Sequence, residues 1–210
     1  MRLRSVVTAT GMIMIAGGLV LGQGQRPASP PGTAATQVGG KYVEGKNGPV
    51  YQGGKWIEIT YGRPIKRQRQ NLFGAGADYG KKLNDEAPVW RAGANQTTRI
   101  KTEVPLVFDG KTLPAGEYDV FVELHPKEWT LIFSTWPAQQ KYDPSNKAEL
   151  WGSYGYTPDK DVLRAPMRVE TLPYSMDQFT IAFIDMTAEG GKLAMMWDKT
   201  MGSIAFKVGS

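Results

Sequence analysis

The stretch EYDVFVEL, residues 117–124, alternates apolar and polar side chains with a period of two. Its even-numbered positions form one apolar face, made of Tyr118, Val120, Val122 and Leu124. Its odd-numbered positions hold the charged Glu117, Asp119 and Glu123, together with Phe121. Successive side chains of a β-strand point to opposite faces of a sheet. The stretch therefore predicts a strand with one buried face and one solvated face.

The chain on either side of this stretch continues in the same way. After a turn at His125-Pro126-Lys127, the apolar side chains of residues 129, 131 and 133 line one face of a second strand, which completes a predicted hairpin. Asp109-Gly110 predicts another hairpin, because both residues tolerate the positive φ of a tight turn. Further strands are predicted over residues 56–61, 96–103, 105–108, 111–113, 167–172, 178–186, 193–197 and 204–208.

The predicted fold class is all-β. Short strands at close intervals are typical of an antiparallel β-sandwich, here of jelly-roll-like or immunoglobulin-like shape. The 25 Gly and 14 Pro among 210 residues favour frequent turns over long helices. At most one short helix is expected, over residues 143–150, where Asp143 is a good N-cap and Pro144 suits the first helical position.

Composition and charge exclude several classes of protein. Hydrophobic residues make up 41% and charged residues 21% of the chain, which permits a packed core. There is no cysteine, so disulfides, thiolate metal sites and cysteine nucleophiles are excluded. The formal net charge of +5 is small and scattered along the chain, so no nucleic-acid partner is expected. No cofactor and no metal site are predicted.

Residues 1–24 are predicted to be a signal peptide. Arg2 and Arg4 precede an apolar run that extends to Leu21, and small residues follow where cleavage is expected. A retained membrane anchor is the alternative, for which the run is near the lower length limit. The protein is therefore predicted to be exported, to the periplasm or beyond the cell, with no stable membrane insertion once the signal is removed.

Residues 25–53 are rich in Gly and Pro and lack apolar periodicity, which indicates a flexible linker. The apolar side chains at positions 42, 43, 50 and 51 leave an edge strand or a docked segment open as an alternative. The folded domain is expected over residues 54–210.

Four groups of short motifs follow one another within this domain. They are ITYGRP at 59–64 with FG at 73–74, VWRAGAN at 89–95 with TT at 97–98, LPAGEY at 113–118 with EWTLIF at 128–133, and WGSY at 151–154 with DVLR at 161–164. In order and spacing they resemble the DUF2911 family, exported bacterial proteins of unknown function. The resemblance implies an all-β fold and carries over no activity. Residues 82–88 and 135–149 are longer than the family pattern, so the loops beside these motifs are expected to differ from those of relatives.

The motif at residues 90–95 contains the first candidates for a binding site. Arg91 offers a planar fork of donors to a carboxylate, sulfate or phosphate. Trp90 offers a surface on which a sugar ring or a cation can stack, and Asn95 offers both a donor and an acceptor. The alternative is structural: Trp90 belongs to the core, Arg91 pairs with an internal carboxylate, and Asn95 supports a turn.

Two other regions add candidates. Arg63 follows the predicted strand at 56–61 and precedes the basic residues Lys66, Arg67 and Arg69. This loop either binds an anion or is a solvated loop whose charges aid solubility. The solvated loop is favoured for Lys66, Arg67 and Arg69, whereas Arg63 belongs to a family-like motif. Trp151 and Tyr154 lie in an aromatic cluster in and around the expanded segment 135–149. That cluster is either a platform for a carbohydrate or a small core that holds the segment to the sandwich.

No catalytic residue is predicted. His125 is the single histidine and lies in a predicted turn, where a bystander is the usual case. Carboxylates are plentiful, but no pattern selects the pair that a glycosidase needs. The leading hypothesis is a non-catalytic module that binds or scaffolds a small anionic or carbohydrate ligand. A glycan hydrolase and a structural protein that assembles through edge strands, including as a homo-oligomer, are the alternatives.

Overall fold

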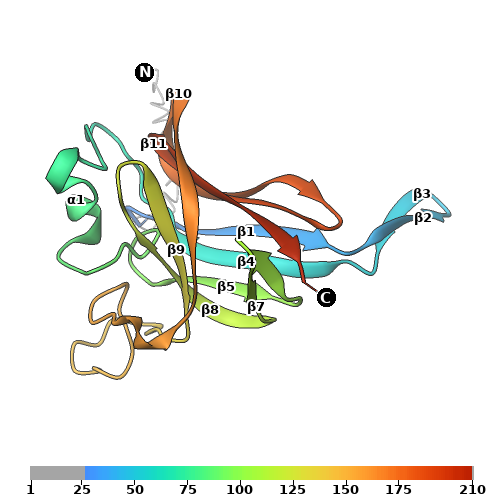
Figure 1. Ribbon diagram of the computed structural model, residues 1–210, viewed down its shortest axis with the longest axis horizontal. Helices are drawn as coiled ribbons and strands as arrows, with labels where there is room; N and C mark the ends of the chain where they lie inside the picture. Colours follow the sequence, from blue (N-terminus) through green and yellow to red (C-terminus); the bar gives the residue numbers. More distant parts are fainter. Residues whose placement is uncertain (1–26, 210) are drawn as a thin grey trace, which may run out of the picture.

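The structure is a computed structural model that describes residues 27–209. It is an all-β protein, as predicted, in which nine strands form one antiparallel sheet in the order β1-β4-β5-β8-β9-β10-β11-β6-β7. The sheet curls over on itself into a sandwich (Figure 1). The strands β1–β6 are Pro31–Val38, Lys41–Gly45, Gly48–Gln52, Lys55–Gly62, Thr98–Thr102 and Leu106–Phe108. The strands β7–β11 are Lys111–Leu113, Gly116–Glu123, Glu128–Ser134, Asp161–Thr187 and Gly190–Val208.

Residues 117–123 of the alternating stretch EYDVFVEL belong to β8, which pairs with β5 on one side and with β9 on the other. The predicted hairpins β8–β9 and β6–β7 are both present. The inner face of the sheet encloses the main core, a cluster rich in aromatic rings. Its largest fully buried side chains are Trp90, Trp129, Trp197, Phe108, Phe133 and Phe179. Burial of such rings supplies most of the free energy that holds the two layers together.

The C-terminal third differs from the predicted series of short strands. Residues 161–187 form the single strand β10, and residues 190–208 form β11. Pro173 was expected to end a strand, but the pairing of β10 with β11 passes it through a register shift between Thr171 and Met176. A bulge of this kind releases a residue from the ladder and bends the strand, which lets proline lie within a long strand.

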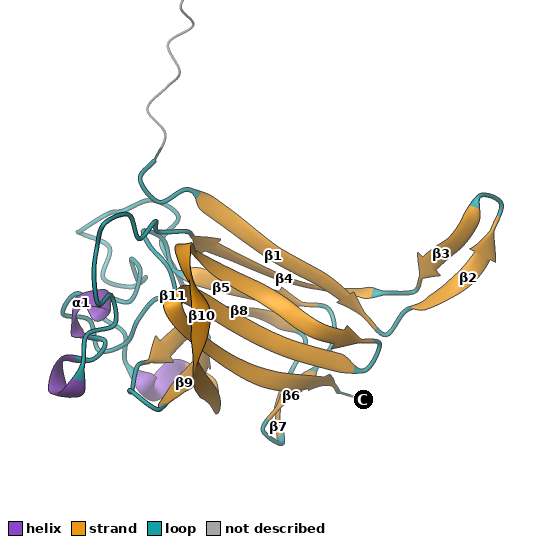
Figure 2. Ribbon diagram, turned by 90° about the horizontal axis from the view of Figure 1, so that it is seen from above, coloured by secondary structure: helices purple, strands orange, loops and turns teal. Residues whose placement is uncertain are grey.

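The prediction of a flexible linker over residues 25–53 is wrong for most of residues 27–53, the part of that range which the structure describes. Residues 31–38 form β1, which pairs with the whole of β4 and buries Val38 in the main core. Strands β2 and β3 form a separate hairpin, called here the arm. The apolar residues at 42, 43, 50 and 51 thus do form strands, but in a two-stranded sheet of their own and not at the edge of the main sheet. Figure 2 shows the arm projecting from the body at the end opposite to α1. Tyr42, at 74% exposure, and Val50, at 48%, leave it with apolar surface in solvent.

In the described part of the chain the one α-helix, α1, is Lys81–Asn84, and single 3₁₀ turns occur at Gly76–Asp78 and Pro158–Lys160. The helix predicted over residues 143–150 is absent. Asp143 does accept hydrogen bonds like an N-cap, from the backbone N–H and the hydroxyl of Ser145, at 2.9 and 2.6 Å. The chain then turns without a helix, because this side-chain bonding supports a turn as well as it supports a helix start.

The segment 135–160, called here the aromatic loop, covers part of the outer face of β8 and β9. Beneath it lies a second, smaller cluster, called here the satellite core, made of Val89, Phe121, Ile132, Leu150 and Tyr156, with Trp136 packed against it. Burial raises the pKa of the Tyr156 hydroxyl, which donates to Asp161 at 2.7 Å. Phe121, the one apolar residue on the otherwise charged face of the stretch 117–124, is thus the central residue of the satellite core.

Within residues 27–209, no helix has the length and apolar character needed to span a bilayer. The predicted signal peptide, residues 1–24, lies outside the described part of the chain.

Candidate functional site

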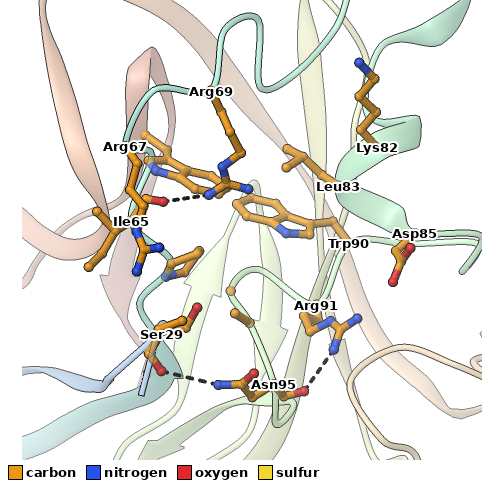
Figure 3. A pocket seen from close by; sticks show the side chains of 15 residues that line it. Ser29, Ile65, Arg67, Arg69, Lys82, Leu83, Asp85, Trp90, Arg91 and Asn95 are labelled. Carbon is orange, nitrogen blue, oxygen red and sulfur yellow. Dashed lines mark hydrogen bonds between the residues drawn. The ribbon is translucent and has the colours of Figure 1, made fainter. Parts of the chain in front are cut away.

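A cleft of about 600 Å³ opens at the end of the sheet that carries α1, and we call it the cationic cleft (Figure 3). Three segments build it: the loop after β4, the region of α1, and the turn at residues 90–95. The indole of Trp197 on β11 completes the lining. Four of its residues are basic and one is acidic; they are Arg67, Arg69, Lys82, Arg91 and Asp85.

The loop after β4 is held firmly to β10 and β11. The Phe179 N–H donates to the Pro64 carbonyl at 2.9 Å, and the Arg67 N–H donates to the Asp177 carboxylate at 3.0 Å. Lys66 forms an ion pair with Asp198, with 2.5 Å between Nζ and Oδ1. Burial raises the pKa of Asp198, but hydrogen bonds from Lys66 and Ser175 bring it below its ordinary value, so the pair stays ionised.

This anchoring fixes the two arginines of the loop at the cleft. Arg69 donates to the Ile65 carbonyl at 2.7 Å, and its guanidinium lies 5.1 Å from the centre of the Trp197 ring. The side chain of Arg67 is exposed, and its guanidinium donates no hydrogen bond to residues 27–209. The interpretation of these residues as a solvated loop was therefore incomplete: both are exposed, and both line a cleft.

The turn at residues 90–95 is set by backbone contacts. Trp90 exchanges two backbone hydrogen bonds with Val122 of β8, each 2.9 Å long. Beyond it, the turn packs directly against the end of β4: a Cβ on Gly62 would lie 1.9 Å from the Ala94 carbonyl oxygen, and one on Gly93 would lie 2.8 Å from the Gly62 oxygen. Only glycine permits this approach at both positions.

Arg91 is positioned by neutral groups. Its Nη1 donates to the Asn95 carbonyl at 2.9 Å, and its guanidinium lies 5.2 Å from the centre of the Tyr154 ring. The Tyr154 hydroxyl in turn donates to Asp85, which lines the cleft. That hydrogen bond raises the pKa of Tyr154, so the hydroxyl stays protonated as a donor. In Figure 3, Arg67, Arg69 and Arg91 surround the opening, and Trp90 lies between Arg69 and Arg91.

The electrostatic balance of the cleft is strongly positive. Within residues 27–209, none of its four basic side chains forms an ion pair, although eight ion pairs occur elsewhere in that range. The single carboxylate, Asp85, accepts from Tyr154. A guanidinium that forms no ion pair and whose orientation is already fixed, as in Arg69 and Arg91, is a strong donor site for an anion, because less side-chain entropy is lost on binding.

The candidate residues from the sequence separate into four groups. Arg91 and Asn95 line the cationic cleft, and Asn95 adopts a positive φ of 63° and donates to the Ser29 carbonyl at 3.3 Å. Trp90 contributes to the lining but is only 1% exposed, so its role as an open stacking surface is wrong and its core role is correct. Arg63 lies outside the cleft and donates to the Phe179 carbonyl and the Thr180 hydroxyl.

Trp151 and Tyr154 line a second cleft, of about 520 Å³, that belongs to the aromatic loop. Tyr142 completes its aromatic lining, and its ring centre lies 5.6 Å from that of Trp151. Tyr154 and Tyr142 are 41% and 58% exposed, so both rings offer surface to a ligand. We call this second site the aromatic cleft.

Sequence reasoning set aside the anion-binding interpretation of Arg67 and Arg69 and missed Lys82 and Trp197, all of which line the same cleft as Arg91. Their grouping depends on contacts between segments that are remote in sequence, and no local pattern signals it. The exposed side chain of His125 is not part of either cleft. No group of three or more His, Asp or Glu side chains suited to a metal ion occurs among the described residues.

By its fold and its cleft, the protein is a β-sandwich with a positively charged site that loops form at one end of the sheet. The chain belongs to DUF2911, a family described as proteins of unknown function, whose model matches residues 48–206. The family indicated by the four motif groups is thereby confirmed, and the match includes β3 and most of the sheet. No curated protein and no solved structure matches the chain.

Proposed function

We propose that this protein, exported from the cytoplasm, binds a small anionic ligand in the cationic cleft. The observation that carries the proposal is the set of four basic side chains, Arg67, Arg69, Lys82 and Arg91, which line one cleft without an ion pair to any residue from 27 to 209. Charges of one sign within one concave site attract and hold a ligand of the opposite sign.

The anchoring of the basic residues supports the same proposal. Hydrogen bonds fix the loop that carries Arg67 and Arg69, and Arg91 lies against Tyr154. Apolar side chains such as Ile65 and Leu83 also line the cleft. A few fixed polar groups on a mainly apolar wall are typical of small-molecule sites. The ligand that fits best has a carboxylate, sulfate or phosphate group attached to a ring or another apolar part.

The proposal is for binding rather than hydrolysis. A glycosidase needs two carboxyl groups separated by about 5 to 9.5 Å across the bond to be cleaved. Asp85 is the one carboxylate among the residues of the cationic cleft, and it accepts a hydrogen bond from Tyr154. In the aromatic cleft, Asp143 and Glu149 accept hydrogen bonds from Ser145 and Asn146, which supports a structural role for both.

The test is a binding screen on the exported form of the protein, residues 25–210, by calorimetry and thermal shift. The probes are phosphate, sulfate, glucuronate and benzoate, and the variants are Arg67→Ala and Arg91→Ala. Loss of one charge-assisted hydrogen bond is expected to weaken binding about 10- to 100-fold. Arg168→Ala, which removes an exposed arginine outside the cleft, is the matched control and is expected to bind as the parent does. Equal binding by all four proteins, or by none, would contradict the proposal.

A further inference from the structure

The cationic cleft is one of several connected depressions. A third cleft, of about 330 Å³, shares Ser29, Ala94 and Asn95 with it. The same third cleft shares Trp151 with the aromatic cleft. The three sites therefore follow one another around the turn that carries Asn95. A ligand longer than a single ring can therefore reach from one cleft into the next.

The cationic and aromatic clefts also meet at one wall. Arg91 lines the first, Tyr154 lines the second, and the guanidinium lies 5.2 Å from the centre of the Tyr154 ring. Because Arg91 and Tyr154 are in contact, a ligand that crosses this wall touches a charge on one side and an aromatic ring on the other.

The two ends of this path differ in chemistry. The cationic cleft has four basic residues to one acid, whereas the aromatic cleft has Lys147 against Asp143 and Glu149. The aromatic cleft offers the rings of Tyr142, Trp151 and Tyr154. Rings of this kind contact the apolar faces of sugars, while carboxylates accept hydrogen bonds from sugar hydroxyl groups and amides both accept and donate them. The aromatic end therefore suits a neutral sugar, and the cationic end suits an acidic one.

We propose that the ligand is an acidic oligosaccharide in which a uronate or sulfated sugar occupies the cationic cleft and a neutral sugar next to it occupies the aromatic cleft. This inference rests on the proposed function, since it requires that the cationic cleft binds an anion. A single-stranded nucleic acid also combines negative charge with rings that stack. Its phosphates recur at every nucleotide, and the excess acid of the aromatic cleft repels them.

The test compares glucuronate with a tetrasaccharide of alternating glucuronate and N-acetylglucosamine, by calorimetry on residues 25–210. The variant is Tyr142→Ala, which removes a 58% exposed ring from the aromatic cleft. Its matched control is Tyr174→Ala, which removes a 54% exposed ring from β10 outside both clefts. The melting midpoints of both variants verify that they are folded.

The tetrasaccharide is expected to bind more tightly than glucuronate, and Tyr142→Ala is expected to weaken it about five- to tenfold while glucuronate binding is unchanged. Arg67→Ala is expected to weaken both probes, and Tyr174→Ala neither. If glucuronate binds but the tetrasaccharide is no tighter or ignores Tyr142→Ala, the inference is overturned and the proposed function stands. If no anion binds, or if Arg67→Ala and Arg91→Ala both bind as the parent does, the inference and the proposed function both fail. Tighter binding of a single-stranded oligonucleotide that depends on Tyr142 would overturn the inference in favour of nucleic acid.

Discussion

Strands β8 and β9 separate two cores that differ in size and in chemistry. Val120 and Leu131 point into the main core, whereas Phe121 and Ile132 point into the satellite core. Strands enclose the main core, but the satellite core has the aromatic loop as its cover. The side chain of Asp119, 1% exposed, lies on this same outer face. The comparison of the two cores shows that a covering loop can exclude water from apolar side chains and still leave a carboxylate, here that of Asp119, buried beneath it. A second sheet packed on the same face rarely leaves a charged side chain buried in this way.

The largest expected effect tests the main core. Trp129→Ala removes a fully buried indole that stacks on Phe73 and donates to the Tyr79 hydroxyl at 3.1 Å. We expect the free energy of unfolding to fall by about 3–5 kcal/mol, because the cavity cannot collapse between two packed layers. Urea unfolding measures the loss. Trp56→Ala, at a position that is 50% exposed, serves as the matched control and is expected to cost far less. Equal losses in the two variants would show that the main core does not dominate stability.

The second effect tests the charge beneath the loop. Burial raises the pKa of Asp119 to about 6, and Arg99, 3.1 Å away, offsets only part of that rise. The folded protein thus binds this proton more tightly than the unfolded chain does. This tighter proton binding by Asp119 stabilises the folded state fully below the unfolded pKa of 3.8, and the stabilisation is lost as pH rises through about 6. A shift of this size corresponds to about 3 kcal/mol.

Urea unfolding between pH 4 and 7.5 measures this contribution. Asp119→Asn is expected to flatten the dependence of the unfolding free energy on pH across that range, because the amide does not titrate. Glu117→Gln, an exposed carboxylate two residues away on the same strand, is the control and is expected to keep the parent's slope. A parent-like slope in Asp119→Asn would mean that this carboxyl is solvated.

The smallest effect tests the satellite core. Leu150→Ala is expected to lower the free energy of unfolding by about 2 kcal/mol, near the low end for such substitutions, since the aromatic loop can settle into the space. The destabilisation is expected to be confined to the aromatic loop. Limited proteolysis is expected to cut within residues 135–160 faster than in the parent, while Ala148→Ser, an exposed neighbour, leaves the cleavage rate unchanged. Cleavage outside that loop would show that the two cores unfold as one.

Much of the fold could be predicted because its strands carry local signals. Alternation identified β8 and β9, and Asp109-Gly110 identified the β6–β7 hairpin. The sequence patterns predicted the wrong element where one residue type is compatible with two local structures. Pro173 breaks most strands but lies at a register shift here, and Asp143 stabilises a turn with the same bonds that begin a helix. The four residues of α1 are too few to show a helical period.

The candidate site was only partly predictable. Arg91 and Asn95 belong to a motif whose composition marks it, and both line the cationic cleft. Arg63 belongs to a similar motif, but its guanidinium holds β4 to β10 instead. Arg67 and Arg69 follow it in a run of charge that is usually a solvated surface. Their place in the cleft depends on Asp177 and Trp197, which no pattern near residue 67 reveals.

The strand that replaced the expected linker has a consequence for anyone who shortens this chain. The family match begins at residue 48, after β1 has ended. A protein trimmed to that boundary would leave the outer edge of β4 as a row of bare N–H and C=O groups, with the site of Val38 empty beneath it. Such an edge is a template that recruits a strand from a neighbouring molecule. The first strand therefore keeps β4 inside the sheet, and a protein that lacks it is expected to be less stable and to associate more readily through the newly exposed edge.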